Sequence, residues 1–269
     1  MIAGLVASEA STRMENPALY AAEVAAIMRG RGIEVIENWH EEAGIPDVLV
    51  VLGGDGTILR TARRVSALNV PLLTVNLGKV GFMAELEPEE VEAYIDQLIK
   101  KDFRLERRMM LHVSVSRNGQ EVFCSDALNE AVVVKHAHMS DLGVYIDGEF
   151  FSDYVADGLI CATPTGSTAY SLAAGGPTVM ADMEAILLTP VCAYMLALKP
   201  LVMDARKVVT IFPEAKGDTW LMVDGQEKVD LQSGDKVEIK RSERGISLIK
   251  FKRRAFYEFL GKKLYRSRA

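Results

Sequence analysis

The stretch Val48-Leu49-Val50-Val51-Leu52-Gly53-Gly54-Asp55-Gly56-Thr57 decides the fold of the first part of the chain. It begins with an unbroken apolar run, as a parallel strand covered on both faces requires. Three glycines and one carboxylate follow, and the pattern then becomes helical through Leu59, Ala62 and Val65. A buried strand that leads through a glycine turn into a helix is typical of an open α/β sheet.

The flanking sequence continues this alternation in both directions. A helix is predicted over Leu19 to Met28, with Asn16 as its N-cap and Pro17 in its first turn. Another helix is predicted to begin at Pro88. Further short apolar runs are predicted to be strands, at Ile2 to Val6, Ile33 to Ile36 and Leu72 to Val75. We therefore expect an α/β domain with a mainly parallel sheet over residues 1–105.

From Met109 onward, the spacing of the apolar residues shortens towards a period of two, as in a β-strand with one buried face. Turns of the hairpin type are indicated at Asn118-Gly119, Asp147-Gly148 and Asp224-Gly225, and strands are predicted at Val237 to Ile239 and Ile246 to Ile249, among others. Residues 106–250 are therefore predicted to form a mainly antiparallel β domain that binds the ligand. The last residues, 251–269, carry an apolar face of Phe256, Phe259 and Leu260, which predicts a helix that packs back on the first domain.

The composition excludes several classes of protein. Of 269 residues, 49% are hydrophobic and 25% are charged, as in an ordinary globular protein, and the net charge is -6. Because the basic residues are scattered until the tail, we expect no nucleic-acid partner. The longest apolar stretch, Ala185 to Leu198, contains Pro190 and is too short to span a membrane.

The cysteines and the first residues predict the compartment. Cys124, Cys161 and Cys192 lie far apart in apolar surroundings and have no paired metal-ligand spacing. They are interpreted as buried thiols in a reducing compartment. The N-terminal residues show no export signal, so a cytoplasmic location is expected.

The glycine turn is a candidate phosphate site. Glycines let the backbone approach phosphate oxygens, and the N-terminus of the following helix favours anions. A carboxylate beside phosphates is repelled by them unless it handles a proton or a cation. Asp55 is therefore predicted to accept a proton from an attacking hydroxyl or to hold Mg²⁺. The alternative is structural, with glycines that only make the bend and Asp55 as a helix cap. The spacing matches neither a Walker A loop nor a G-x-G-x-x-G fingerprint.

A second polar segment lies in the second half of the chain. Residues 157–171 are rich in small hydroxyl side chains, and Gly175-Gly176-Pro177 follows them. Such a segment offers many hydrogen-bond groups with little bulk, as a sugar or nucleotide pocket needs. Asn129-Glu130 adds an amide and a carboxylate, and a carboxylate can accept from both hydroxyls of a ribose. An isolated pair of this kind more often caps a turn.

Taken together, these motifs resemble those of the NAD kinase family. The resemblance rests on the Gly53–Thr57 string, the 76–82 segment Asn-Leu-Gly-Lys-Val-Gly-Phe, Asn129-Glu130, and the segment from Asp157 to Pro177. It implies that ATP, or polyphosphate in some members, phosphorylates the 2′-hydroxyl of the adenosine ribose of NAD. It also implies Mg²⁺ or another divalent cation, and a homodimer or homotetramer.

The resemblance also assigns roles to residues. Asp55 would be the general base, Asn129 and Glu130 would hold the adenosine ribose, and Asp157 would hold the nicotinamide side. The other binding positions implied are Gly53, Gly54, Gly56, Thr57, Asn76, Thr165, Thr168, Ala169, Tyr170, Ser171 and Gln226. His138 matches a ligand-facing histidine of the family, or is a solvated loop histidine.

The chain departs from the family pattern at a few positions. Val155 stands where the family often has a basic residue, and Ala193-Tyr194 and Lys199-Pro200 replace the Pro-His and Arg-Pro pairs. These changes leave the donor preference open. Two other functions compete with an NAD kinase: a lipid or sugar kinase that shares the glycine turn, and a catalytically silent regulator that binds NAD.

Overall fold

The computed structural model describes residues 1–79, 81–135, 139–195, 197–214 and 218–251. Its contacts divide the chain into two compact units. Unit 1 comprises Met1–Arg107 and the chain from Ile246 onward, and unit 2 comprises Arg108–Gly245. The predicted boundary at residue 105 lies close to this division. His138 and the predicted C-terminal helix, apart from Phe251, fall outside the described residues.

Unit 1 contains a parallel sheet in the order β2-β1-β3-β4-β16. Its strands are β1 (Ile2–Ala7), β2 (Glu34–Ile36), β3 (Val48–Gly53), β4 (Leu72–Asn76) and the end of β16 (Lys236–Lys250). The whole of β3 is buried, as its apolar sequence requires. The prediction of a mainly parallel sheet in an α/β domain is confirmed.

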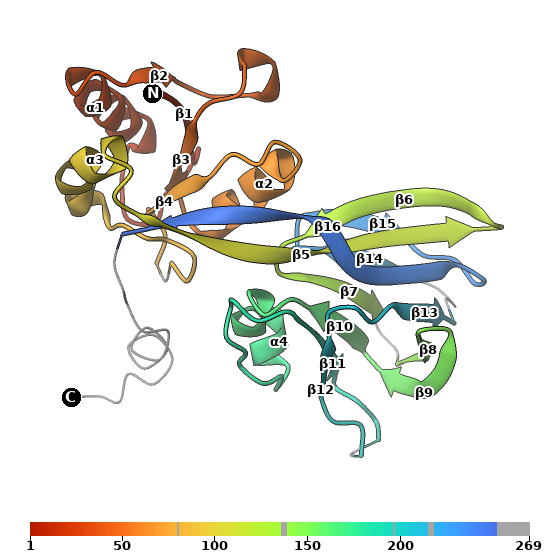
Figure 1. The fold of residues 1–269 in the computed structure, drawn as a ribbon. Coiled ribbons are helices and arrows are strands. Elements are labelled where there is room, and N and C mark those ends of the chain that lie inside the picture. Colours follow the sequence, from red (N-terminus) through yellow and green to blue (C-terminus); the bar gives the residue numbers. More distant parts are fainter. Residues whose placement is uncertain (80, 136–138, 196, 215–217, 252–269) are drawn as a thin grey trace, which may run out of the picture. The chain divides into compact units, whose positions relative to one another are not determined.

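Helices cover both faces of this sheet (Figure 1). On one face, α1 (Pro17–Gly30) and α3 (Val91–Ile99) share a core with alternate residues of β3. The other face meets α2 (Asp55–Val65), and η1 (Glu41–Ala43) and η2 (Pro88–Glu90) lie in the connections. The predicted cap of α1 is present, because the Asn16 side chain accepts a hydrogen bond from Leu19 N at 3.0 Å.

Unit 2 is built from two antiparallel sheets. One contains β5 (Arg104–Arg117), β6 (Gln120–Ala127), β8 (Ser140–Ile146), β9 (Glu149–Ala156), β13 (Val209–Pro213) and part of β16. The other has the order β12-β11-β10-β7-β14-β15, with bounds Leu201–Asp204, Ala185–Val191, Gly158–Ala162, Glu130–Lys135, Thr219–Val223 and Glu227–Asp230. The prediction of a mainly antiparallel β domain is confirmed.

The core of unit 2 lies between its two sheets. Leu111, Val133 and Leu159 belong to this core, together with residues of β8, β11, β13 and β14. The other face of the β7–β10–β11 sheet is also apolar, and Ala174 and Val179 pack on it. The short helices η3 (Gly166–Thr168) and α4 (Tyr170–Ala173) therefore belong to a segment that is held against this second face.

Two expectations need correction. The predicted strands Val237–Ile239 and Ile246–Ile249 are parts of one strand, β16, whose end pairs in parallel with β4 through Leu248 and Leu72. Periodicity cannot reveal this, because a long strand that exchanges one pairing partner for another keeps the same alternation. The prediction of buried thiols is wrong for Cys124 and Cys192, which are exposed, and holds for Cys161.

Candidate functional site

The Asp55 carboxylate holds the loop that follows β4. Its Oδ2 accepts from Phe82 N and its Oδ1 from Met83 N, each at 3.1 Å. The N-cap of α2 is Gly54, and Asp55 is the first residue of the helix. Because an ionised carboxylate has about four acceptor positions, two N–H donors orient the group and leave capacity for a hydroxyl or a cation. A simple helix-capping role for Asp55 does not describe these contacts.

The glycine turn and the loop after β4 approach each other closely. A Cβ atom on Gly78 would lie 3.1 Å from Gly54 Cα. Gly81 has a φ of +64°, and a Cβ there would lie 2.6 Å from the Asn76 side chain. Asn76 is buried, with Oδ1 accepting from Gly78 N at 3.0 Å and Nδ2 donating to Glu87 Oε2 at 3.2 Å. Asn76 therefore shapes this loop.

In unit 2, the predicted Asn129-Glu130 pair lies at the start of β7, and both residues are buried. Thr163 fastens this segment to the end of β10: its N–H donates to Asn129 O at 2.8 Å and its Oγ1 donates to Leu128 O at 2.6 Å. The Gly166 backbone lies so close that a Cβ atom there would be 2.2 Å from Asn129 O. The Asn129-Glu130 pair therefore lies directly against residues 163–166 of the second predicted motif.

The pKa of Glu130 in this site is strongly perturbed. Its side chain is buried, and Oε2 has no hydrogen-bond partner among the residues that the structure describes. Burial, and then the nearby Asp224 carboxylate, raise the pKa of Glu130 to about 8, against the opposing effect of the Tyr170 backbone N–H. A buried carboxyl with an unsatisfied oxygen is costly and is characteristic of functional sites.

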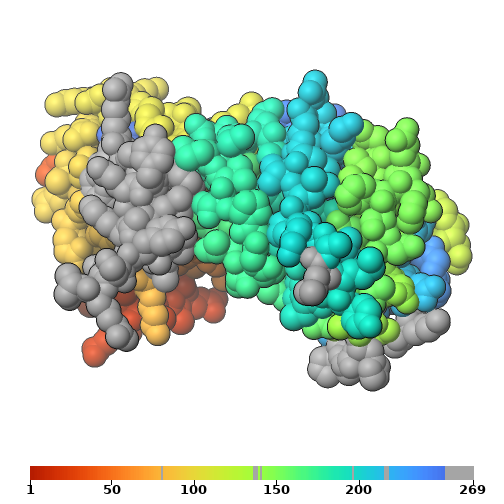
Figure 2. All heavy atoms as spheres, turned by 90° about the horizontal axis from the view of Figure 1, so that it is seen from below, coloured from red at the N-terminus to blue at the C-terminus, as the bar shows by residue number. Residues whose placement is uncertain are grey.

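The hydroxyl residues after β10 differ in whether they are free to contact a ligand or are engaged in internal hydrogen bonds. Thr165 Oγ1 accepts from Arg108 Nη1 at 3.2 Å, and Thr168 Oγ1 donates to Thr165 O at 3.2 Å. Ser171 is buried and its Oγ lies 2.9 Å from Thr189 Oγ1. Tyr170 is 42% exposed, and its segment, coloured blue-green, forms part of the surface in Figure 2. The buried hydroxyls therefore fix the segment, while Tyr170 is available to a ligand.

The structure does not bring all of the predicted residues together. Asp157 precedes β10, where Gly158 pairs with Val134, whereas Glu130 pairs with Ala162 at the other end of that strand. At about 3.4 Å per residue, Asp157 lies roughly 17 Å along the strand from Ala162. Gln226 is exposed and its N–H donates to Val223 O at 2.9 Å, within a tight turn.

Sequence reasoning missed two residues of the unit 2 site. Arg108 is buried and contacts Thr165, although in the sequence it lies in a charged run that suggests a solvated strand. Asp224 is also buried, and its carboxylate contacts the Leu128–Glu130 segment. The sequence identifies Asp224-Gly225 only as a turn, and no local signal indicates a partner some 95 residues away.

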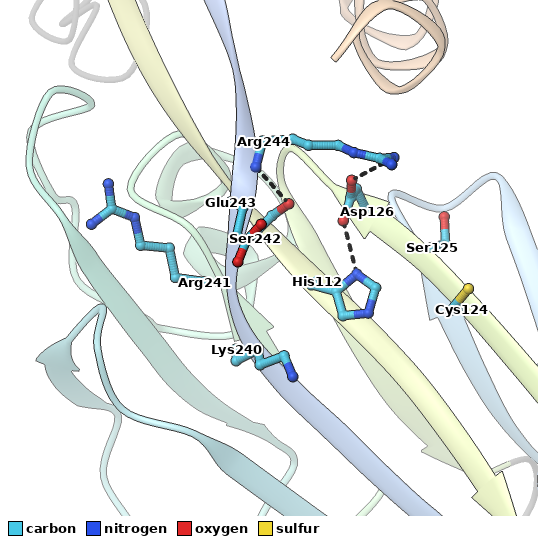
Figure 3. A pocket seen from close by; sticks show the side chains of 9 residues that line it. All are labelled: His112, Cys124, Ser125, Asp126, Lys240, Arg241, Ser242, Glu243 and Arg244. Carbon is cyan, nitrogen blue, oxygen red and sulfur yellow. Dashed lines mark hydrogen bonds and ion pairs between the residues drawn. The ribbon is translucent and has the colours of Figure 1, made fainter. Parts of the chain in front are cut away.

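A separate cavity of unit 2, of about 440 Å³, contains none of the predicted site residues. It lies between β5, β6 and β16, and Figure 3 shows Asp126 between His112 and Arg244. His112 Nδ1 is 3.1 Å from Asp126 Oδ1, and Arg244 Nη1 is 3.6 Å from Asp126 Oδ2. Lys240 and Arg241 pair with carboxylates as well. Because its cations already have acidic partners, this cavity is a poor phosphate site.

The described residues contain no group of three or more His, Cys, Asp or Glu side chains that could hold a metal ion. Their helices are all too short or too polar to span a bilayer.

Comparison with known families identifies the chain. Residues 15–103 match the ATP-NAD kinase N-terminal domain, and residues 128–251 match the ATP-NAD kinase C-terminal domain. The chain belongs to the NAD kinase family. It is therefore a kinase, as the resemblance of its motifs predicted, and its activity is that of an NAD kinase.

Individual relatives agree with this assignment. The chain is 41% identical to the NAD kinase of Moorella thermoacetica over 227 residues, covering 83% of this chain and 73% of the relative. It is 38% identical to the NAD kinase of Syntrophotalea carbinolica over 264 residues, covering 91% and 93%.

Solved structures of the family have the same fold. An NAD kinase from Archaeoglobus fulgidus in complex with ATP is 28% identical, with a TM-score of 0.79 and coverage of 98% of this chain and 99% of that one. Yeast NADH kinase in complex with NADH is 24% identical, with a TM-score of 0.87 and coverage of 100% and 88%. At this identity, the yeast enzyme supports the fold alone.

Replacement of Gly166 by alanine tests the packing of the unit 2 site. Because the added Cβ would meet the Asn129 carbonyl, the backbone must shift, and we expect Gly166→Ala to lower the free energy of unfolding by about 1–3 kcal/mol. Urea denaturation followed by circular dichroism measures the change. Gly143→Ala is the control, because its nearest neighbour would be at 3.6 Å. Equal stability of the two variants would contradict the close contact.

The pKa of Glu130 predicts a pH dependence of stability. Unfolded Glu130 loses its proton near pH 4.5, whereas the folded protein retains it until about pH 8. Between these values the folded state binds the extra proton, so the contribution of Glu130 to stability falls as the pH rises. Urea denaturation from pH 5 to 9 should show a smaller fall in Glu130→Gln than in wild type. The exposed Glu149→Gln is the control, and a wild-type slope in Glu130→Gln would refute the assignment.

Proposed function

We propose that this chain transfers the terminal phosphoryl group of ATP to the 2′-hydroxyl of the adenosine ribose of NAD, which yields NADP. The observation that carries the proposal is the buried Glu130 carboxyl, whose Oε2 lacks a partner among the described residues. A ribose hydroxyl would satisfy this oxygen. The ATP complex of the Archaeoglobus relative supports ATP as the donor.

In this proposal Asn129 and Glu130 hold the adenosine ribose, and Tyr170 with its neighbours meets the adenine. Asp157 contacts the nicotinamide half, and its separation from Glu130 along β10 suits two ends of one extended dinucleotide. Thr165, Thr168, Ala169 and Ser171 complete the binding segment, and Gln226 would meet the ligand from the separate turn between β14 and β15. The Ser171–Thr189 and Arg108–Thr165 hydrogen bonds support a positioning role for the buried hydroxyls.

Asp55 acts as the general base in the proposed mechanism. Its carboxylate, oriented by Phe82 N and Met83 N, takes the proton of the attacking hydroxyl. Gly53, Gly54 and Gly56 leave room for the phosphates, and Thr57 lies in the first turn of α2 behind them. Because phosphoryl transfer requires mainly positioning and charge stabilisation, no covalent intermediate with the protein is needed.

A divalent cation, Mg²⁺ or a similar ion, completes the proposal. Mg²⁺ commonly binds through one or two carboxylates together with substrate phosphates. The donor chemistry of the glycine turn fits this mode, since Asp55 keeps acceptor capacity beyond its two N–H contacts. The ion would neutralise charge that develops on the transferred phosphoryl group.

The cellular setting is also a proposal. We expect the chain to work in the cytoplasm as a homodimer or homotetramer, without nucleic acid or a membrane as partner. Polyphosphate remains an alternative donor and NADH an alternative acceptor, as the yeast NADH kinase illustrates by its name. Incubation of the purified protein with each donor and acceptor in the presence of Mg²⁺, followed by detection of NADP or NADPH, separates these possibilities. No product with any pair would favour a silent NAD-binding regulator.

The role of Asp55 is tested by Asp55→Asn. An amide cannot accept the proton, so we expect turnover to fall by about 10² to 10⁴, while NAD binding is largely retained. Steady-state kinetics and NAD titration calorimetry measure the two effects. Glu89→Gln serves as the control, because Glu89 is an exposed acid of unit 1. Near-normal turnover in Asp55→Asn would remove Asp55 from the mechanism.

The role of Glu130 is tested by Glu130→Gln. A ribose contact persists from the ground state to the transition state, so its loss should raise the KM for NAD and leave kcat nearly unchanged. Initial rates at varied NAD and saturating ATP measure both constants. A loss confined to kcat would be inconsistent with ribose binding by Glu130.

A further inference from the structure

The Asp224 carboxylate accepts hydrogen bonds from three consecutive backbone N–H groups. Oδ2 accepts from Leu128 N at 3.0 Å, and Oδ1 accepts from Asn129 N at 2.8 Å and from Glu130 N at 3.1 Å. Asp224 is only 5% exposed. Hydrogen bonds to an ionised acceptor are stronger than neutral ones, and buried ones are stronger still. This single side chain therefore satisfies all three backbone N–H groups of the segment that carries Asn129 and Glu130, while Thr163 contacts the Leu128 and Asn129 carbonyls.

The local turn does not by itself require an aspartate. Asp224 and Gly225 have φ values of +49° and +63°, and Gln226 N donates to Val223 O at 2.9 Å. These are the features of a tight hairpin turn with left-handed backbone, in which asparagine is at least as favourable. An asparagine side chain, however, has one acceptor oxygen, and its amide would point an N–H group at a donor of the 128–130 segment.

The backbone of the same residue adds a fourth contact. Asp224 N donates to Glu130 O at 2.9 Å, next to the pairing of Val223 with Ala131 between β14 and β7. Asp224 is thus bound to the Asn129-Glu130 segment through both its main chain and its side chain. Any displacement of the Asp224-Gly225 turn is transmitted to Glu130.

We infer that Asp224 is a positioning residue of the NAD site, which fixes Asn129 and Glu130 in the arrangement that the adenosine ribose meets. The inference rests on the proposed function, because it concerns the same ligand. Asp224 acts through the 128–130 backbone and does not itself contact the dinucleotide.

The charge of Asp224 has a second effect on the site. The Glu130 carboxyl experiences the Asp224 carboxylate from the β14–β15 turn and the Tyr170 N–H from α4, and the Asp224 charge raises the pKa of Glu130. Ribose hydroxyls that donate to Glu130 favour its ionised form, so NAD should bind more tightly as the pH approaches 8. Removal of the Asp224 charge should move this dependence towards lower pH.

Asp224→Asn keeps the size and the turn and removes one acceptor and the charge. We expect the KM for NAD to rise about tenfold or more, the effect of one lost charge-assisted hydrogen bond, with kcat changed much less. The pH midpoint of the KM should also move towards acid. Asp147→Asn is the matched control, because Asp147-Gly148 is also an Asp-Gly hairpin turn with left-handed backbone, and its carboxylate contacts Lys207 and Val208 instead.

Asp224→Glu provides a second variant in case Asp224→Asn does not fold. It keeps the charge and displaces it by one methylene, so the KM should rise while the pH midpoint stays near the wild-type value. Hydrogen exchange of the Leu128–Glu130 amides should accelerate in both variants. A wild-type KM and a wild-type pH midpoint in a folded Asp224→Asn protein would overturn the inference.

The experiment separates this inference from the proposed function. If wild type forms NADP but the Asp224 variants have normal kinetics, the positioning role fails and the proposed function stands. If wild type forms no NADP with any donor, the proposed function fails. In that case unchanged amide exchange at residues 128–130 in the variants also overturns the positioning role, and accelerated exchange supports the hold of Asp224 on this segment.

Discussion

The candidate site of each unit depends on a buried or half-buried carboxylate that satisfies backbone N–H groups of an irregular segment. A turn that must receive a polar ligand cannot pair its main chain in a sheet, and unpaired buried N–H groups are costly. Asp55 solves this problem in unit 1 by accepting from Phe82 N and Met83 N. Asp224 solves it in unit 2 by accepting from the 128–130 segment. In each unit a carboxylate side chain therefore orders a loop that the hydrogen bonds of a β-sheet do not order.

Asp55 and Asp224 differ in how much hydrogen-bond acceptor capacity they keep for a ligand. Asp55 is half-buried and keeps acceptor capacity beyond its two N–H contacts, so it is able to serve both the fold and the chemistry. Asp224 is buried and engaged by three N–H donors, and its remaining influence on a ligand is electrostatic. Glu130 lies beside that charge, and its raised pKa reflects two carboxyl groups confined to one buried region. Asp224 thus binds the backbone N–H of Glu130 and also raises the pKa of its side chain.

Much of the fold was predictable because it follows from local patterns. The apolar run of β3, the Asn16 cap of α1 and the Asn118-Gly119 turn each depend on neighbours in sequence, and the structure contains all three. The sequence predicts two strands where the structure has the single long strand β16, because no local signal marks the point where a strand exchanges one pairing partner for another. Cys124 was predicted to be buried but is exposed on β6, since alternation along one strand does not reveal which face is covered.

Local sequence patterns also fail to identify all the residues of the candidate site in unit 2. Asp147-Gly148 and Asp224-Gly225 have the same sequence, the same left-handed backbone and the same place at the tip of a hairpin. At Asp147 the carboxylate meets an exposed lysine and one N–H, whereas at Asp224 it meets three buried N–H groups of the Asn129-Glu130 segment. The difference arises because β14 pairs with β7, which brings residues 94 to 96 positions apart into contact. Local chemistry explains why an aspartate is allowed at each turn, and tertiary pairing alone decides which aspartate contacts the Asn129-Glu130 segment.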